Sequence, residues 1–183
     1  AEWEQIPLGS SGYRKFQGLQ YELITDVGDI GPDYQPGHAH CDTLSFEMYV
    51  DQQPILVNTG TSTYEKDERR QRERSTAAHN TVQIGNREQS EMWAGFRVAR
   101  RAKAFIMKEE PMLLQATHTG YDHLGVRHTR EFECHEAMVR ISDHISAHPK
   151  REGATAKNFF LTPCRACFHF HPDVTVHLKN DSL

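Results

Sequence analysis

Strict alternation of apolar and polar side chains after Thr43 is the feature that most constrains the fold of this 183-residue chain. The apolar positions are Leu44, Phe46, Met48 and Val50, and the residues between them are polar or amphipathic. A period of two is the pattern of a β-strand that turns one face toward a core. The segment therefore predicts a half-buried strand.

Two histidines and an aspartate stand just before this strand. Carried backward, the same register places His38, His40 and Asp42 on the core-facing row. Burying imidazoles and a carboxylate costs free energy unless they have a partner. A metal ion, a role in proton transfer or a dense hydrogen-bond network would each supply one.

The rest of the chain is a succession of short strand-like segments separated by Gly, Pro and Asp turn signals. They cover residues 12–16, 19–27, 96–108, 113–119, 126–134, 137–145, 158–161, 166–171 and 174–178. Many short strands without a long helical period predict an all-β sandwich or barrel. The length predicts a single domain over residues 1–183, and both ends read as cut points in a longer chain.

Three separated segments are predicted to meet at one spot. Residues 51–54 form a turn that sends the chain back along residues 55–57, which would place Asn58 beside His40 across the ladder. His79 comes just before a further predicted strand, residues 80–84. An imidazole, an amide and a second imidazole would then converge.

Composition excludes some classes of function. The net charge of −4 provides no basic field for nucleic acid or an anionic membrane. No apolar run approaches the length of a membrane span. Four cysteines are too few for a disulfide scaffold, and the lone Cys164–Cys167 pair lacks the second pair of a zinc ribbon.

Residues 59–75 form a long polar segment in which Tyr64 is the only aromatic residue. Segments of this kind are usually functional or disordered. For the arginines of residues 69–74, interleaved with Glu, we favour the interpretation of solvated loop charge. A platform for an acidic sugar is the alternative.

Three motifs occur in a fixed order: GHAHCDTLSFEM, LVNTGTSTYE and RSTAAHNTV. Together they resemble the C-terminal β-sandwich domain of the heparinase II/III-like polysaccharide lyases, and WAGFRVARRA, GYDHLG and FHFHP also fit that pattern. The resemblance runs from about Tyr13 to about Val176. It implies a two-layer antiparallel β-sandwich of the supersandwich type. In the family an α/α toroid precedes this domain, and the toroid is absent from this sequence.

The resemblance also implies a zinc site. His40 and His79 match its imidazole ligands, but the third ligand of the family, an aspartate, is replaced here by Asn58. An amide oxygen can ligate without charge, so affinity for a dication should fall. Asp42 could compensate as a ligand or as a partner of an imidazole. A hydrogen-bond network of these four side chains without an ion is the alternative.

The resemblance assigns catalytic roles to other residues. His38 matches a histidine implicated in the lyase site, although a solvent-facing histidine at a strand end is the alternative. The ring of Tyr64 could pack its loop, or its hydroxyl could reach the sugar. Arg72 and Arg74 could pair with a uronate carboxylate in bidentate fashion, or be surface charge. His118, His123, His128, His135 and His144 show no ligand spacing. His169 and His171 repeat the HxH spacing, but no third ligand accompanies them.

The implied reaction is β-elimination on a uronic-acid polysaccharide such as alginate, a glycosaminoglycan or a capsular glycan. With the toroid missing, the domain would hold part of the cleft and be inactive alone. The alternative is a non-catalytic module of a capsule or exopolysaccharide locus that binds acidic glycan. A cupin-like metalloenzyme is a further alternative, but in that interpretation the RSTAAHNTV motif would have no role. A secreted or periplasmic bacterial parent protein is expected.

Overall fold

Two antiparallel sheets form the body of the domain. The computed structural model describes residues 4–148 and 162–177. The first sheet runs in the order β1 (Glu4–Pro7), β2 (Tyr13–Gln17), β3 (Tyr21–Asp26), β4 (Phe46–Val50) and β5 (Gln53–Leu56). The second runs in the order β12 (Met138–Ala147), β11 (Val126–His135), β10 (Leu113–His118) and β9 (Ala104–Glu110).

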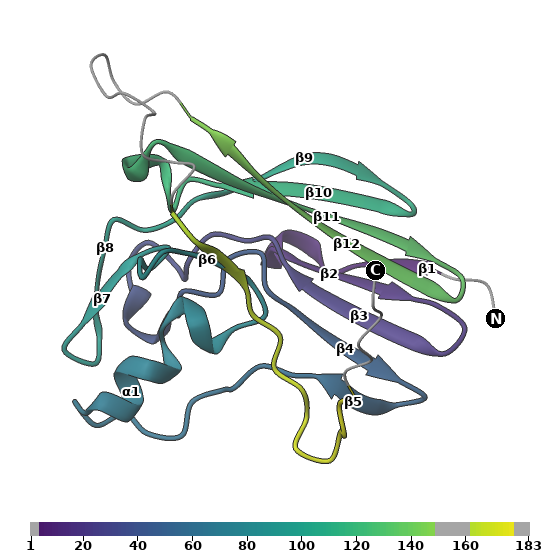
Figure 1. Ribbon diagram of the computed structural model, residues 1–183, viewed down its shortest axis with the longest axis horizontal. Helices are drawn as coiled ribbons and strands as arrows, with labels where there is room; N and C mark the ends of the chain where they lie inside the picture. Colours follow the sequence, from purple (N-terminus) through teal and green to yellow (C-terminus); the bar gives the residue numbers. More distant parts are fainter. Residues whose placement is uncertain (1–3, 149–161, 178–183) are drawn as a thin grey trace.

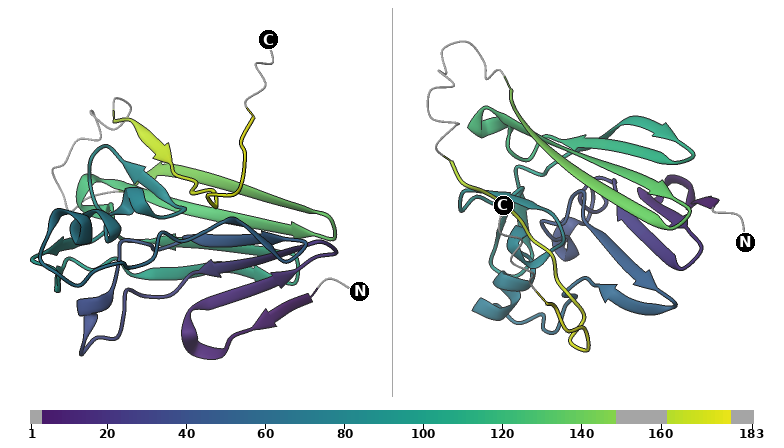
Figure 2. Two further views of the ribbon diagram at one scale, coloured as in Figure 1. Left: turned by 90° about the horizontal axis from the view of Figure 1, so that it is seen from below. Right: turned by 45° about the vertical axis from the view of Figure 1, so that its right-hand side comes forward.

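Smaller elements gather at one end of these sheets. The strand pairs are β6 (Val82–Ile84) with β13 (Cys164–Ala166), and β7 (Glu91–Trp93) with β8 (Arg97–Ala99). The helices are α1 (Glu68–Glu73), η1 (Gly9–Ser11), η2 (Pro36–His38), η3 (Thr76–Ala78) and η4 (Asp122–Leu124). Figure 1 shows the two large sheets as layers with α1, β7 and β8 together at one end, and Figure 2 agrees from two further directions.

Every second residue along the facing strands points inward, and these side chains pack between the two sheets and stabilise the layers. Along β11 buried and half-buried residues alternate over its whole length. The core combines Phe16, Leu23 and Phe46 of the first sheet with Leu114 and Phe132 of the second. The rings of Phe46 and Phe132 meet edge to face at 5.9 Å. The predicted two-layer β-sandwich is confirmed.

The predicted hairpin after β4 is also confirmed. Asp51 and Gln52 form a two-residue turn with φ of 48° and 64°, the backbone that tight hairpins require at both positions. The register pairs Met48 with Leu56 and Val50 with Gln53.

The backward extension of β4 to the histidines is wrong. Leu44 has a φ of 61°, so the extended backbone stops there, and the strand begins at Phe46. His38 lies in η2, and His40 and Asp42 lie in irregular backbone. Asn58 follows the end of β5, so no ladder joins it to His40.

Other predicted strands are partly wrong. The strand expected over residues 96–108 is two strands, β8 and β9, because Arg100 adopts a φ of 40° and residues 100–103 leave the sheet. Residues 174–177 are not a strand, and the strand expected at 158–161 lies outside the described residues. Among the described residues, no helix has the length and apolar character needed to cross a membrane.

Candidate functional site

Irregular segments at one end of the sandwich bring two histidines and an aspartate together. Ligand atoms of His40, Asp42 and His79 all lie within 4.8 Å of one another. The two imidazole rings are 5.2 Å apart between centroids. His40 follows η2, and His79 is the C-cap of η3. We call these three residues the His40 cluster.

The His40 cluster has the chemistry of a cation site. His79 is fully buried, and neither of its ring nitrogens has a hydrogen-bond partner among the described residues. Buried polar atoms are rarely left in this state. Two imidazole nitrogens and a carboxylate are a donor set that suits zinc, with a fourth position for water. These residues therefore fit a zinc ion.

Burial keeps both imidazoles neutral, which is the form that binds a metal. It lowers the pKa of His79 to about 4, and nearby His169 adds to this. Burial, with His79 next in effect, lowers the pKa of His40 to about 4. Burial raises the pKa of the Asp42 carboxyl, although His40 opposes that shift.

An arginine already uses one nitrogen of His40. Nη1 of Arg70 donates to Nε2 of His40 at 3.1 Å, and Oγ1 of Thr61 lies 3.2 Å from the same atom. A neutral imidazole offers one lone pair. A cation ligated by His40 would therefore compete with Arg70 for it.

Asn58 lines one pocket with His40, but it is not paired with His40 across neighbouring strands. Its Oδ1 accepts the backbone N–H of Gly60 at 2.9 Å, which shapes the turn after it. Asn58, His40 and Asp42 nonetheless line one pocket. The carboxylate of Asp42, which sequence reasoning treated as a compensating ligand, is the one grouped with both histidines.

The residues after His79 fasten the converging segments together. Nδ2 of Asn80 donates to the carbonyl oxygens of Phe46 at 2.8 Å and Val57 at 3.1 Å. Oγ1 of Thr81 donates to the carbonyl of Thr43 at 2.9 Å. Sequence reasoning missed this role, although Asn80 and Thr81 stand inside the third motif.

His38 and Tyr64 belong to an exposed aromatic group beside the cluster. The ring of His38 meets the rings of Tyr64 and Phe96 edge to face, at 5.4 and 5.8 Å. Tyr64 stacks on Phe96 with 12° between the planes and remains 56% exposed. The ring of Tyr64 therefore packs, and its surface remains open to a ligand.

The predicted arginines separate into an exposed and a buried residue. Arg72 is exposed. Arg74 is fully buried, and its Nε and Nη1 donate to the carbonyls of Ala39 and Gly95 at 3.0 and 2.6 Å. The guanidinium of Arg74 supports the backbone beside His40, and pairing of Arg72 or Arg74 with a uronate stays a prediction. Solvated loop charge is wrong for Arg70 and Arg74, which are both buried.

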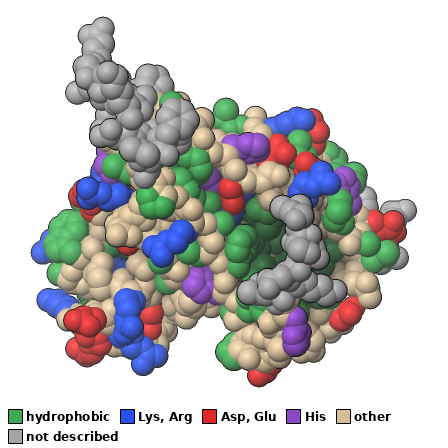
Figure 3. All heavy atoms as spheres, in the orientation of Figure 1, with side chains coloured by type: hydrophobic (Ala, Val, Ile, Leu, Met, Phe, Trp, Pro, Cys, Tyr) green, Lys and Arg blue, Asp and Glu red, His purple; other side chains and the backbone are tan. Residues whose placement is uncertain are grey.

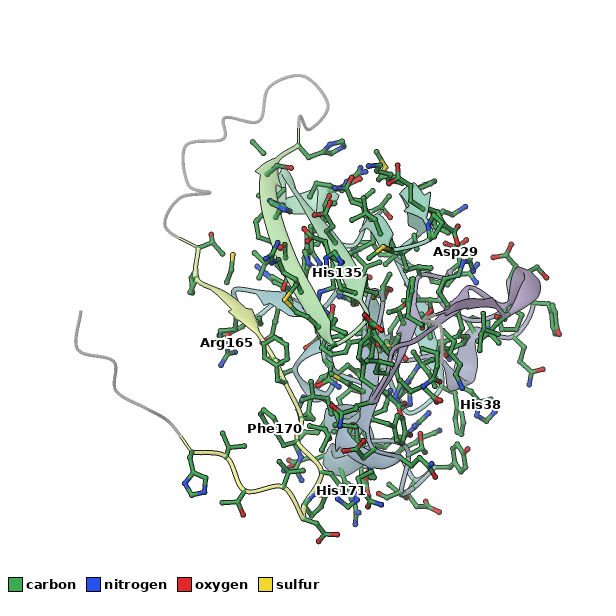
Figure 4. The ribbon with its side chains drawn as sticks, turned by 90° about the vertical axis from the view of Figure 1, so that its right-hand side faces the viewer. Asp29, His38, His135, Arg165, Phe170 and His171 are labelled. Carbon is green, nitrogen blue, oxygen red and sulfur yellow. The ribbon has the colours of Figure 1, made fainter. Side chains whose placement is uncertain are left out.

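A pocket of about 690 Å³ opens beside the cluster. Its lining includes His38, His40 and Asn58 together with Asp26 and Asp29. Figure 4 shows His38 and Asp29 on the same side of the molecule. Burial, and then the nearby Asp42, raise the pKa of Asp26 to about 7. Figure 3 shows charged side chains of both signs over the end that carries α1.

A second buried group lies between β10, β11 and β12, and sequence reasoning missed it. It contains His118, His128, Arg130 and Asp143, and we call it the His118 cluster. Nε2 of His118 lies 3.1 Å from Nδ1 of His128, whose Nε2 lies 2.8 Å from Oδ1 of Asp143. Nε and Nη2 of Arg130 donate to the two carboxylate oxygens of Asp143 at 2.7 and 2.9 Å. The only sequence signal was the placement of both histidines at buried positions of predicted strands.

Comparison with known proteins identifies the family and the fold. A family model described as heparinase II/III-like, C-terminal, matches residues 2–183. A search of curated proteins found no match. Among solved structures, a heparinase III described as the BT4657 gene product is 18% identical with a TM-score of 0.61, over 86% of this chain and 26% of that one.

Further solved structures give the same picture. A mutant of the heparan sulfate lyase HepC from Pedobacter heparinus is 18% identical with a TM-score of 0.61, over 80% of this chain and 23% of that one. A structure described as heparinase III is 19% identical with a TM-score of 0.58. The likeness shows a shared fold, and the chain spans about a quarter of the length of these structures.

Proposed function

This chain belongs to the heparinase II/III-like family through its C-terminal domain, and from that membership we propose that it forms part of a lyase that cleaves uronic-acid-containing polysaccharide by β-elimination. The observation that carries the proposal is the pocket in which His38 lies beside the His40 cluster. Exposed rings of Tyr64 and Phe96 stand next to His38. Aromatic faces and a proton-transfer group beside an open pocket suit a sugar substrate.

The reaction requires removal of the proton at C5 of the uronate, stabilisation of the enolate that develops, and protonation of the departing 4-oxygen. We assign proton transfer to His38, because imidazole is the side chain suited to it near neutral pH. The hydroxyl of Tyr64 is the second candidate for this role. Both side chains reach the surface beside the pocket.

The cation would be zinc, held by His40, His79 and Asp42 with the Asn58 amide nearby. When bound, it would supply a fixed positive charge at the wall of the pocket. The protein itself contributes a rigid frame, because Asn80 and Thr81 tie the backbone segments on which these ligands stand. In this proposal the ion holds the segments in place.

The rest of the catalytic machinery would come from other parts of the parent protein, since this chain spans about a quarter of the length of the solved relatives. We expect little turnover by the 183-residue chain alone. A second function, a non-catalytic module that binds acidic glycan, is favoured by one observation. The position that matches the family's third ligand, an aspartate, carries the uncharged Asn58, which weakens a dication site.

The test is the ultraviolet absorbance of unsaturated uronate product, measured with the full-length parent on alginate, heparan sulfate and a capsular uronate polymer. We expect His38→Ala to lower kcat by about a hundredfold or more, as loss of a general acid or base does. His144→Ala, an exposed change on β12, is the control. Absence of product from every uronate polymer would favour the binding module.

A further inference from the structure

Arg70 is a buried arginine with an unused hydrogen-bonding edge. It lies in α1 and is 1% exposed. Its Nη1 donates to Oγ1 of Thr61 at 3.2 Å and to Nε2 of His40 at 3.1 Å. Its Nε and Nη2 have no partner among the described residues. These two groups form the side of the guanidinium that matches the two oxygens of a carboxylate.

Other arginines of this chain use the same edge for that purpose. In each, Nε and Nη2 donate to the two oxygens of one carboxylate: Arg14 to Glu109, Arg127 to Asp122, and Arg130 to Asp143. Arg70 has the same burial as Arg130, at most 1% exposed. It lacks the acidic partner that Arg130 has.

Two carboxylates near Arg70 in sequence, Asp67 and Glu73, are engaged elsewhere. Oδ1 of Asp67 accepts the backbone N–H of Arg70 at 2.7 Å and caps α1. Glu73 accepts from Ser62 and from Nε of Arg69. A buried cation without a counter-charge is costly, because the charge has lost its water and gained no anion. Nε and Nη2 of Arg70 meet no carboxylate among the described residues, so both are available to an anion from outside them.

We propose that Arg70 binds, through Nε and Nη2, the carboxylate of a uronic acid that enters over Thr61 and Tyr64. The bidentate edge matches two oxygens of one anion, and the choice of a uronate carboxylate rests on the proposed function. Arg70 is then a specificity-determining residue, in the place that the sequence had suggested for Arg72 and Arg74.

The route to Arg70 passes two exposed side chains. Thr61 lines the pocket together with His40, and both are bonded to Nη1 of Arg70. The Tyr64 ring lies 5.3 Å from Cζ of Arg70 and is itself 56% exposed. Residues 57–64 have no regular secondary structure. Rotation of Tyr64 would uncover the guanidinium of Arg70, whose Nη1 stays bonded to His40 and Thr61.

The first experiment needs no substitution. The Nε–Hε resonance of Arg70 in the 183-residue chain is followed by NMR during titration with a tetrasaccharide of alternating glucuronate and N-acetylglucosamine. We expect the Arg70 resonance to move and that of Arg130, already paired with Asp143, to stay. The carboxyl-reduced tetrasaccharide should move neither. An Arg70 resonance that ignores the acidic sugar, or responds equally to the reduced one, overturns the proposal.

Variants measure the size of the effect by calorimetry with the same two tetrasaccharides. Arg70→Gln should weaken binding of the acidic sugar by about ten- to a hundredfold, the range for a hydrogen-bonded charge. Arg70→Lys keeps the charge but loses the paired edge, so it should recover only part of the affinity. Arg140→Gln, an exposed arginine on β12 with no proposed role in the site, is the control. Equal binding by the wild type and Arg70→Lys would contradict bidentate recognition.

Failure of this inference is distinguishable from failure of the proposed function. If binding depends on Arg70 but the parent protein does not cleave the polymer, the inference is supported and the proposed lyase function is contradicted. If the parent protein cleaves the polymer and Arg70→Lys does not change KM, the proposed lyase function is supported and the inference is contradicted.

Discussion

The two buried histidine clusters differ in how completely their polar atoms are satisfied. In the His118 cluster, Nδ1 of His118 accepts the N–H of Gly120 at 3.1 Å, so its Nε2 donates to His128. His128 in turn donates to Asp143 at 2.8 Å. Every ring nitrogen there has a partner. In the His40 cluster, both nitrogens of His79 have none among the described residues.

Burial alone therefore does not mark a binding site in this protein. His79, His118 and His128 are all fully buried. A satisfied network holds strands together, whereas unsatisfied nitrogens beside a carboxylate suit a cation. The two clusters differ in whether their ring nitrogens are hydrogen-bonded, and this difference distinguishes a network that stabilises strands from a group that suits a cation.

The clusters are also connected. Nη1 of Arg130 donates to the carbonyls of Leu44 at 2.9 Å and Asn80 at 2.6 Å. These residues lie two positions after Asp42 and one after His79. The satisfied cluster thus fixes the backbone that carries the unsatisfied one.

The largest expected difference comes from removing the acid of each cluster. Asp143→Ala leaves Arg130 buried and unpaired, which should lower the free energy of unfolding by about 3–5 kcal/mol. Asp42→Ala in metal-free protein should cost about 1 kcal/mol or less, because burial already disfavours its charged form. Urea unfolding with a chelator measures both. Similar losses in the two variants would contradict the comparison.

Acid should destabilise the metal-free protein through both clusters. Burial lowers the pKa of His118 and His128 as well as those of His40 and His79, so the unfolded chain binds protons first. For His40 and His79 the contribution is complete above about pH 6.5 and is lost as pH falls through about 4. Each group adds a slope of up to about 1.4 kcal/mol per pH unit.

Asp26 should act in the opposite direction. Its pKa of about 7 lies above the unfolded value, so its stabilising contribution is lost as pH rises through about 7. Stability should therefore be highest between about pH 6 and 7, which urea midpoints from pH 4 to 8 would show. His79→Gln should reduce the slope of unfolding free energy against pH, below about pH 6.5, by the amount that corresponds to about one proton. A slope unchanged in that variant would show that His79 is not neutral by burial.

Zinc should stabilise only proteins with an intact His40 cluster. At a hundred times the dissociation constant it should raise the free energy of unfolding by about 2.7 kcal/mol. His79→Gln should abolish this increment, whereas His118→Gln should keep it despite lower stability. Thermal unfolding with and without zinc gives the answer. An increment retained in His79→Gln would place the ion elsewhere.

A smaller effect separates Asp42 from Asn58 as the third ligand. Asn58→Asp should tighten zinc by about tenfold, equivalent to about 1.4 kcal/mol, because it adds a charged oxygen to the same pocket. Asp42→Asn should weaken zinc by more, since its carboxylate is the one grouped with both imidazoles. Calorimetric titration with zinc ranks the variants. A stronger loss for Asn58→Ala than for Asp42→Asn would make Asn58 the ligand.

The sequence by itself determined the strand-rich fold and the hairpin that follows β4. Alternation over residues 44–50 fixed the core face of β4, and the polar pair after it fixed the hairpin, because both depend on local side-chain period and turn geometry. The three motifs placed His40, Asn58 and His79 in segments that do converge on one pocket region.

Only the tertiary structure decided which polar groups meet and which remain unpaired. The left-handed backbone at Leu44 moved His40 and Asp42 out of the strand and toward His79. Packing of α1 against the motif segments buried Arg70 and Arg74, which local composition had suggested were solvated. The pairing of His118 with His128 depends on the register of β10 and β11. Hydrogen-bond partners are set by contacts between distant segments, and a local pattern carries no information about them.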